Sequence, residues 1–364
     1  MIDGMVVIDA TTHAYNLADG NLVGGRYAHV FREVLWGLHA RCTPPDARVS
    51  RQAFCTDWQP ETLARTLFTE SDVDVAVHHR LRLDSLFADG LCAREKNEEL
   101  ARRWPRRFIT YAGLNPLDGI DTCLRELRAQ VERLPDTVGL KLYPDAGTPD
   151  RSWRMDDPDF APLYELAIEL GLKVIAVHKV VPNGLTPLDP YRIDDLERVA
   201  IAYPRLNFEI VHGGLPPFVD EVTLALTRFP NVYANLEITS AFLERGFGYV
   251  REAIAQFIGF AGAEKILYAS GGMHFHPQPI IEAIAGLEFG KDLLARYRIE
   301  QITPAQKALI LGGNYARMTG LDLGLLAKGV AGDEFATAGR RPPWTAWREA
   351  TRAETDTTPV EVTA

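Results

Sequence analysis

Eight short apolar runs, separated by longer and more polar stretches, are the feature of this 364-residue sequence that most restricts its fold. The runs are rich in Val, Ile and Leu and alternate little between apolar and polar residues, which is typical of strands buried on both faces. They occupy residues 5–9, 73–79, 107–115, 138–144, 172–178, 206–212, 231–238 and 265–271.

The stretches between the runs have helical spacing. Apolar residues recur every three or four positions from Leu124 to Leu134, and a second such pattern over 160–170 stops at Gly171. Strands that alternate with helices form right-handed βαβ units and a parallel sheet. Eight units predict an α/β fold of the closed (β/α)8 TIM-barrel type over residues 1–320. An open, doubly wound sheet is the alternative.

Two segments lie outside this repeat. Residues 14–58 form an insertion after the first strand, with a predicted helix over 26–40 that carries an apolar stripe. The insertion can be read as a surface excursion, a lid or a subunit contact, since long loops on barrels tend to be functional. Residues 321–364 form a C-terminal extension in which Trp344 and Trp347 follow two prolines. We expect an oligomer with one of these segments in the contact, because both add aromatic surface to a complete barrel.

Composition argues against several classes of partner. The net charge is −10 and no block of Lys or Arg exceeds two residues, which argues against nucleic acid or an anionic membrane. No apolar run approaches the roughly 18 residues of a membrane span. The four cysteines form no CxxC pair, and the N-terminus lacks the pattern of a signal peptide. We therefore expect a cytoplasmic protein with reduced thiols.

Most histidines stand where the predicted strands end. Seven of the nine lie at or just after a strand end: His13, His78, His79, His178, His212, His274 and His276. Lys141 and Tyr143 hold the same position on the fourth strand, and Glu237 on the seventh. Because barrel active sites are built at the C-terminal ends of the strands, these side chains predict a site there. Each also has a structural reading, as a hydrogen-bonded residue or, for Lys141, as an ion-pair partner of Glu237.

Two histidines end neighbouring strands in the same phase. His178 and His212 close the matching pieces VIAVH and FEIVH. Neighbouring strands lie about 4.8 Å apart, so the two imidazoles can converge on one ion. His13 follows the first strand in a similar position. We predict that His13, His178 and His212 bind one divalent metal ion at the mouth of the barrel, since three neutral imidazoles can hold zinc or ferrous iron.

Several pieces of the chain together resemble one family. They are VVIDATTHAY, VGLKLYP, LKVIAVH, YPRLNFEIVHGG, ILYASGG and ALILGGNYARMTGL. The chain resembles the amidohydrolase-related barrels that include aminocarboxymuconate-semialdehyde decarboxylase and the hydroxybenzoate decarboxylases. The resemblance implies a divalent ion, namely zinc, iron or manganese, and hydrolysis or decarboxylation of a small organic carboxylate or amino acid. His79, Lys141 and Tyr143 are then the candidate substrate-binding residues.

The sequence departs from the family pattern at two ligand positions. Thr11 stands where the family has the first ligand of the strand-one pair, and Gly271 stands where it has a strand-eight aspartate. Without that carboxylate, a general base must come from another side chain. The catalytic candidates are His212, Glu237, His274 and His276.

Three functions remain open at this point. The first is an active metal enzyme with an altered site, in which His13 and His178 hold the ion and His212 is a ligand or an acid–base group. The second is a partner subunit in a hetero-oligomer with a related barrel that carries the main metal centre, similar to the two-component non-haem oxygenase 2-aminoisobutyric acid hydroxylase. The third is a metal-free scaffold.

Overall fold

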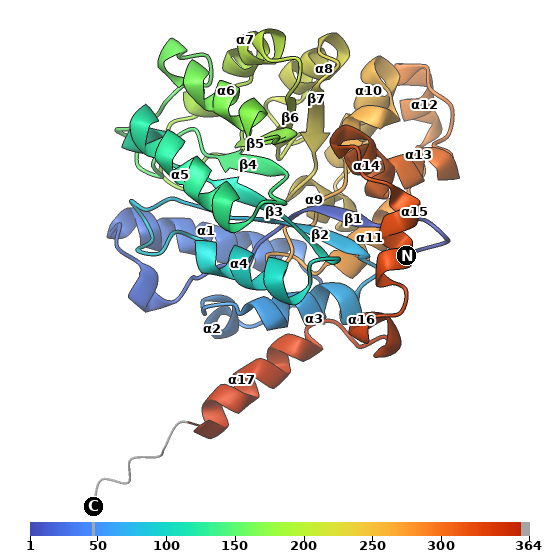
Figure 1. Cartoon of the computed structure of the whole chain (residues 1–364). Helices are drawn as coiled ribbons and strands as arrows, with labels where there is room; N and C mark the ends of the chain where they lie inside the picture. The colour runs from blue at the N-terminus through green and yellow to red at the C-terminus, as the bar shows by residue number, and fades with distance from the viewer. Residues whose placement is uncertain (46–47, 358–364) are drawn as a thin grey trace, which may run out of the picture.

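The computed structural model describes residues 1–45 and 48–357 and confirms the TIM barrel. Eight parallel strands follow one another in chain order around one sheet (Figure 1). They are β1 Ile8–Thr12, β2 Val75–His79, β3 Phe108–Gly113, β4 Gly139–Leu142, β5 Val174–His178, β6 Asn207–Val211, β7 Val232–Asn235 and β8 Ile266–Leu267. The doubly wound alternative is wrong, because it needs a reversal of strand order and these strands run from first to last in sequence.

The sheet closes on itself between β1 and the segment that continues β8. The amide of Ala10 donates to the carbonyl of Tyr268 at 3.1 Å, and the amide of Gly271 donates to the carbonyl of Thr11 at 3.0 Å. These bonds satisfy backbone groups that an open sheet would leave at its edges.

Two strands differ clearly from their predicted runs: β8 covers only Ile266–Leu267 of residues 265–271, and β1 is shifted along the chain. β1 begins at Ile8 rather than at residue 5, because Ile2 and Met5 pair in a tight turn ahead of it. The strand ends at Thr12, three residues beyond the end of the predicted run. This shift places His13 directly at the C-terminal end of the strand.

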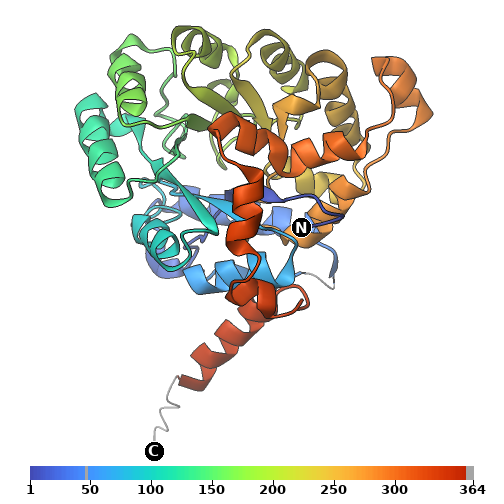
Figure 2. The ribbon, with the colours of Figure 1, turned by 45° about the vertical axis from the view of Figure 1, so that its right-hand side comes forward.

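A ring of helices surrounds the sheet (Figures 1 and 2). The helices are α3 Pro60–Glu70, α4 Arg94–Arg103, α5 Ile120–Arg133, α6 Ala161–Glu169, α7 Asp194–Ala202, α8 Val219–Arg228, α9 Thr239–Glu244, α10 Gly248–Ala261, α11 Pro277–Ala285, α12 Lys291–Tyr297, α13 Pro304–Ala308 and α14 Asn314–Thr319. In α5, Leu127 and Val131 of the predicted stripe are buried. Burying one such side chain stabilises the fold by about 1.5–3 kcal/mol, so the stripe decides which helix face turns inward.

The insertion after β1 contains α1 Arg26–Cys42 and α2 Arg51–Phe54. The first of these is the helix predicted over 26–40, extended by two residues, and its Phe31 and Leu35 are buried. Residues 46–47 of the insertion lie outside the described part of the chain. Its role as a lid or a subunit contact remains a prediction.

The C-terminal extension folds back onto the barrel of its own chain. After α15 Leu323–Val330, both α16 Glu334–Thr337 and α17 Thr345–Thr357 contact α3. Trp344 is buried against this surface, whereas the far end of α17 leaves the body of the barrel (Figure 2). Residues 358–364 of the predicted extension lie outside the described residues. An oligomeric contact through this segment remains a prediction.

Across the described ranges 1–45 and 48–357, no helix combines the length and the apolar composition that crossing a membrane requires.

Candidate active site

A small cavity at the C-terminal end of the barrel marks the candidate site. Its volume is about 30 Å³. Its polar floor is formed by side chains that follow the strands: Tyr15, Tyr143, His178, His212 and Glu237. Its roof is formed by apolar side chains of α1, among them Phe31, Leu35 and Leu38. Four residues singled out from the sequence therefore line one space.

The imidazoles of His178 and His212 face each other at the ends of β5 and β6. Nε2 of His178 donates to the carbonyl of Val181 at 2.7 Å, and Nδ1 of His212 donates to the carbonyl of Glu237 at 3.1 Å. Because a carbonyl only accepts, the other two nitrogens carry lone pairs when the rings are neutral. Those nitrogens, His178 Nδ1 and His212 Nε2, are 3.2 Å apart. Burial lowers the pKa of His212 to about 4 and that of His178 well below its ordinary value.

Two lone pairs that face each other repel unless a cation lies between them. A shared proton can fill this role, and so can a divalent ion. Two nitrogens that bind one ion at about 2.0–2.1 Å in tetrahedral or octahedral geometry are themselves about 2.8–3.4 Å apart. In each ring the other nitrogen is already anchored to a carbonyl, which is how metal-binding histidines are held. The pair therefore fits two ligands of one ion.

His13 lies near this pair, but one of its nitrogens is engaged elsewhere. Its Nε2 donates to Oε1 of Glu237 at 2.9 Å, and both side chains are buried. Its Nδ1 is buried without a hydrogen-bond partner among the described residues. In the described part of the chain, no three His, Cys, Asp or Glu side chains are placed to hold a metal ion together. Binding of one ion by all three predicted histidines therefore stays a prediction.

Glu237 supplies the negative charge of the site. Burial acts to raise the pKa of its carboxyl, but His13, His212 and Lys141 together outweigh burial and hold the pKa well below its ordinary value. The carboxylate is therefore ionised near neutral pH. With His13 bonded to it, Glu237 forms a buried pair that can accept and return a proton.

The predicted substrate-binding residues lie at the same mouth. Lys141 is 1% exposed, and among the described residues it has no hydrogen-bond or ion-pair partner. Its ammonium lies 5.4 Å from the ring centre of Tyr143. Burial lowers its pKa to about 8, with Glu237 acting in the opposite direction. His79 donates from Nε2 to a backbone carbonyl, and its Nδ1 is buried and has no partner within the described residues.

Three other strand-end histidines are bonded to surrounding elements. His78 accepts the amide of Ala14 at 3.1 Å. His274 donates to a backbone carbonyl within α1 at 2.9 Å. His276 lies 3.3 Å from a carboxylate oxygen of Glu70 on α3. These bonds join the insertion and α3 to the barrel, so catalytic roles for His274 and His276 remain predictions that the geometry does not favour.

Sequence reasoning did not single out Glu209, which lies deeper in the barrel. Its carboxylate accepts the hydroxyl of Tyr111 at 2.8 Å and the side-chain amide of Asn235 at 2.7 Å. That amide also donates to the hydroxyl of Thr11 at 2.8 Å. Burial raises the pKa of Glu209 to about 7, and that of Asp9 on β1 also to about 7. A lone acid inside an otherwise apolar strand run is the signal that could have identified Glu209.

The chain is similar to proteins of one known family. A family model described as amidohydrolase matches residues 57–321. The chain belongs to the amidohydrolase family. This confirms the resemblance drawn from its motifs. A search of curated proteins returns no significant match.

Solved structures share the amidohydrolase fold at low identity. A 2,6-dihydroxybenzoate decarboxylase solved with 2,6-dihydroxybenzoate is 16% identical, with a TM-score of 0.51, covering 87% of this chain and 100% of that one. The 5-carboxyvanillate decarboxylase of Sphingomonas paucimobilis is 17% identical, with a TM-score of 0.52 and coverages of 88% and 100%. The Novosphingobium aromaticivorans enzyme, solved with manganese, is 15% identical, with a TM-score of 0.55 and coverages of 87% and 97%.

The structure accounts for both departures from the amidohydrolase pattern. The hydroxyl of Thr11 is already bonded to Asn235. Gly271 has a φ of +66°, and a Cβ placed there would lie 3.2 Å from both Cγ and Oε1 of Glu237. The Glu237 side chain thus occupies the space that a side chain at position 271 would need. The carboxylate of this site comes from the segment after β7 instead of the segment after β8.

Gly271→Ala should lower the free energy of unfolding by about 1–3 kcal/mol, because the new Cβ meets Glu237 and because the positive φ disfavours a side chain. Chemical denaturation measures the loss. In a Glu237→Ala background the steric part should vanish, leaving about 1 kcal/mol from the backbone. An equal loss in both backgrounds would show that Glu237 is not the obstacle.

Several residues around the site have a left-handed backbone conformation. Four non-glycine residues that follow β5 to β8 have positive φ: Val180, His212, Ile238 and Met273. Each such residue costs on the order of 1–3 kcal/mol, and such residues cluster at functional sites. The conformation at His212 is thus part of what directs its ring toward His178.

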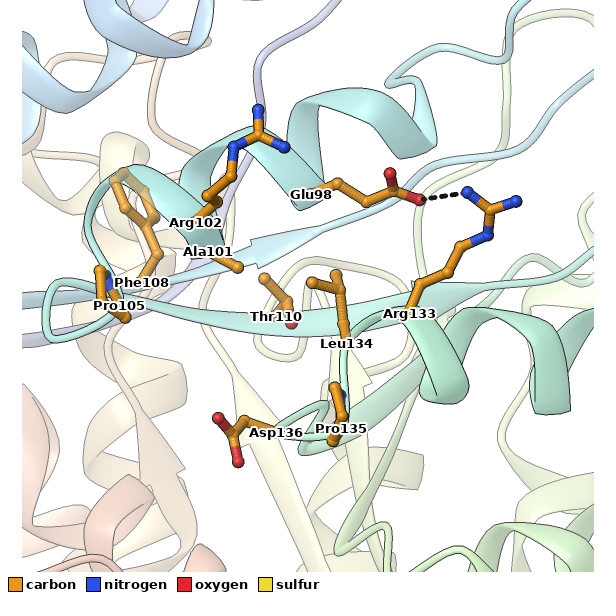
Figure 3. A pocket seen from close by; sticks show the side chains of 10 residues that line it. All are labelled: Glu98, Ala101, Arg102, Pro105, Phe108, Thr110, Arg133, Leu134, Pro135 and Asp136. Atoms are coloured by element: carbon orange, nitrogen blue, oxygen red, sulfur yellow. Dashed lines mark ion pairs between the residues drawn. The ribbon is translucent and has the colours of Figure 1, made fainter.

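A larger cavity, of about 360 Å³, lies between α4 and α5 near the N-terminal end of β3 (Figure 3). Figure 3 shows Glu98 of α4 directed toward Arg133 of α5, and their charged atoms are 3.8 Å apart. TIM-barrel active sites lie at the other end of the strands. We therefore assign the candidate site to the smaller cavity in spite of its size.

Proposed function

We propose that the chain is a metal-dependent enzyme, or a subunit of one, that hydrolyses or decarboxylates a small organic carboxylate or amino acid. Membership of the amidohydrolase family and the shared fold with carboxylate decarboxylases support the reaction class. The observation that carries the proposal is the pair of buried, neutral imidazoles whose free nitrogens, on His178 and His212, converge to 3.2 Å.

Each residue of the site would have a separate role in this reaction. A divalent ion, zinc, iron or manganese, would activate a water molecule or polarise a substrate oxygen. His178 and His212 would hold the ion. Glu237 would accept or return a proton, with His13 as the positioning residue behind it. Lys141 would neutralise the carboxylate of the substrate, because a buried ammonium without a partner is costly until an anion meets it.

Chelator-treated protein should bind about one Zn²⁺ or Mn²⁺ per chain, and His212→Ala should weaken the Kd by at least about 100-fold. Loss of groups that merely support metal ligands already costs 10–100-fold, so loss of a ligand should cost more. Isothermal titration calorimetry measures the Kd. His78→Ala, which also removes a buried imidazole, is the matched control and should leave the Kd unchanged. Equal weakening in both variants, or an absence of binding to the wild-type protein, would reject the metal pair.

The reaction itself is tested with a panel of small aromatic and aliphatic carboxylates and amino acids, supplied with Mn²⁺ or Zn²⁺. Release of CO₂ indicates decarboxylation, and loss of an ester, amide or lactone indicates hydrolysis. Metal-dependent turnover of at least one compound supports the proposal.

One observation favours a second candidate, a partner subunit of a two-component metal oxygenase. Within the described residues only two ligand imidazoles converge, and no third His, Cys, Asp or Glu completes the set. A sister chain would then carry the main metal centre. Co-expression with the neighbouring gene product separates the two candidates, because a partner subunit should copurify with its sister chain and show metal-dependent turnover only in that complex.

A further inference from the structure

We propose that α1 is the gate of the candidate site and that the C-terminal tail, residues 341–346, holds it shut through Trp344 and His39. The cavity beneath α1 has a volume of about 30 Å³, which is room for about two water molecules. An organic carboxylate or amino acid is larger, so it can enter only if a covering element moves. This inference does not depend on which reaction the site performs.

Apolar contacts close the gate. Phe31 and Leu35 of α1 are buried, and both line the cavity together with His178 and His212. The loop after β5 approaches α1 closely, since a Cβ at Gly184 would lie 3.4 Å from the Cα of Phe31. Side chains packed without polar bonds can separate as a unit, which is how many active-site lids open.

The two ends of the insertion are fastened at one place. Asn16 pairs with Asp57 in an isolated bridge. The ammonium of Lys96 donates to the carbonyls of Ala14 and Trp58, both at 2.8 Å. Because the insertion leaves and rejoins the barrel at this point, α1 can move while the two ends of the insertion stay fixed.

A pair of histidines joins α1 to the loop after β8. Nε2 of His274 donates to the carbonyl of Leu35 at 2.9 Å. Nδ1 of His39 donates to the carbonyl of His274 at 2.7 Å, and the amide of Val49 donates to Nε2 of His39 at 3.2 Å. Both rings thus hold α1 in the closed position.

Trp344 of the C-terminal tail packs against this pair of histidines, His39 and His274, which we call the latch. It is 1% exposed, and its ring centre lies 6.1 Å from that of His39, 5.5 Å from that of Trp58 and 5.2 Å from that of His276. Its φ is +60°, a left-handed conformation that side chains rarely adopt. The surrounding contacts therefore hold Trp344 in a position that its own backbone disfavours.

The tail itself is fastened to α3. The amide of Ala346 donates to the buried carboxylate of Glu70 at 2.6 Å. The amide of Arg341 donates to the carbonyl of Thr69 at 2.9 Å. Trp344 is thus fixed to the barrel on both sides, and α1 rests against it through His39.

Hydrogen–deuterium exchange of the full chain, read by mass spectrometry, tests the latch. Trp344→Ala should speed exchange of the α1 peptide by about tenfold, because local opening rather than global unfolding limits exchange at a lid. Carbethoxylation by diethyl pyrocarbonate should rise by a similar factor at His178 and His212, with the exposed His29 as internal reference.

Phe335→Ala is the matched control. Phe335 is a buried aromatic residue of α16 whose ring packs on Phe68 of α3 and on Trp104. It should leave α1 exchange unchanged relative to the barrel strands. Equal acceleration in both variants, or none in Trp344→Ala, would overturn the proposal. If Trp344→Ala fails to fold, His39→Phe must accelerate α1 exchange, and unchanged exchange there would overturn the proposal equally.

Discussion

The buried histidines of chelator-treated protein should destabilise the fold as the pH falls from 6.5 to about 5. Three histidines outside the candidate metal pair, His39, His78 and His274, cause this effect. Burial lowers their pKa values to about 4, about 3 and about 3. His39 and His78 also accept a backbone amide through a ring nitrogen, so protonation would break a hydrogen bond.

Proton binding by the folded and unfolded states decides whether the free energy of unfolding rises or falls with pH. In the unfolded chain each ring takes up a proton near pH 6.5, whereas the folded protein resists until pH 4 or below. These three rings therefore bind more protons in the unfolded state throughout this window, and their contribution to the free energy of unfolding falls as the pH falls. Glu209 and Asp9, whose pKa values burial raises to about 7, act in the opposite direction. At pH 5 each ring costs about 2 kcal/mol, or about 6 kcal/mol for the three, against a typical total stability of 5–15 kcal/mol.

Urea denaturation at a series of pH values between 8 and 5 measures this dependence. In His78→Gln, the free energy of unfolding should fall less steeply below pH 6.5, by the contribution of one histidine. The exposed His29→Gln is the matched control and should leave the curve unchanged. An identical pH dependence in the wild-type protein and in His78→Gln would contradict the prediction.

Lys96→Met should lower the free energy of unfolding by about 3–5 kcal/mol. Lys96 is a buried cation whose ammonium pairs with Asp57 and donates to the carbonyls of Ala14 and Trp58. Methionine fills a similar volume but leaves these buried acceptors without a donor, and each such loss is costly. The two ends of the insertion should then separate more easily.

Chemical denaturation gives the loss in stability, and hydrogen–deuterium exchange shows whether the segments on either side of α1 open first. Lys173→Met, at an exposed lysine, is the control and should change stability by less than about 0.5 kcal/mol. A loss below about 1 kcal/mol in Lys96→Met would mean that the insertion is held by other contacts.

The fold could be predicted because its signal is local. A strand buried on both faces must be apolar throughout, so each barrel strand leaves a run of Val, Ile and Leu that needs no knowledge of its neighbours. The meeting of His178 and His212 was predictable for a related reason. Both residues stand at the ends of adjacent parallel strands, and strand spacing brings those two ends close together. In the observed register His178 pairs with Val211, so the positive φ at His212 is needed as well to turn its ring toward His178.

The apolar runs and motifs are therefore enough to specify the barrel, its family and the strand-end positions of its polar side chains. The directions of side chains beyond the strands depend on the folded chain as a whole. His274 and His276 follow β8 through Gly271 and Met273, both with positive φ, and this path carries them toward α1 and α3. Glu237 occupies the space beside Gly271, although the two residues follow different strands. Directions in loops depend on contacts between residues far apart in the chain, whereas a strand fixes the direction of each side chain by its own pleat.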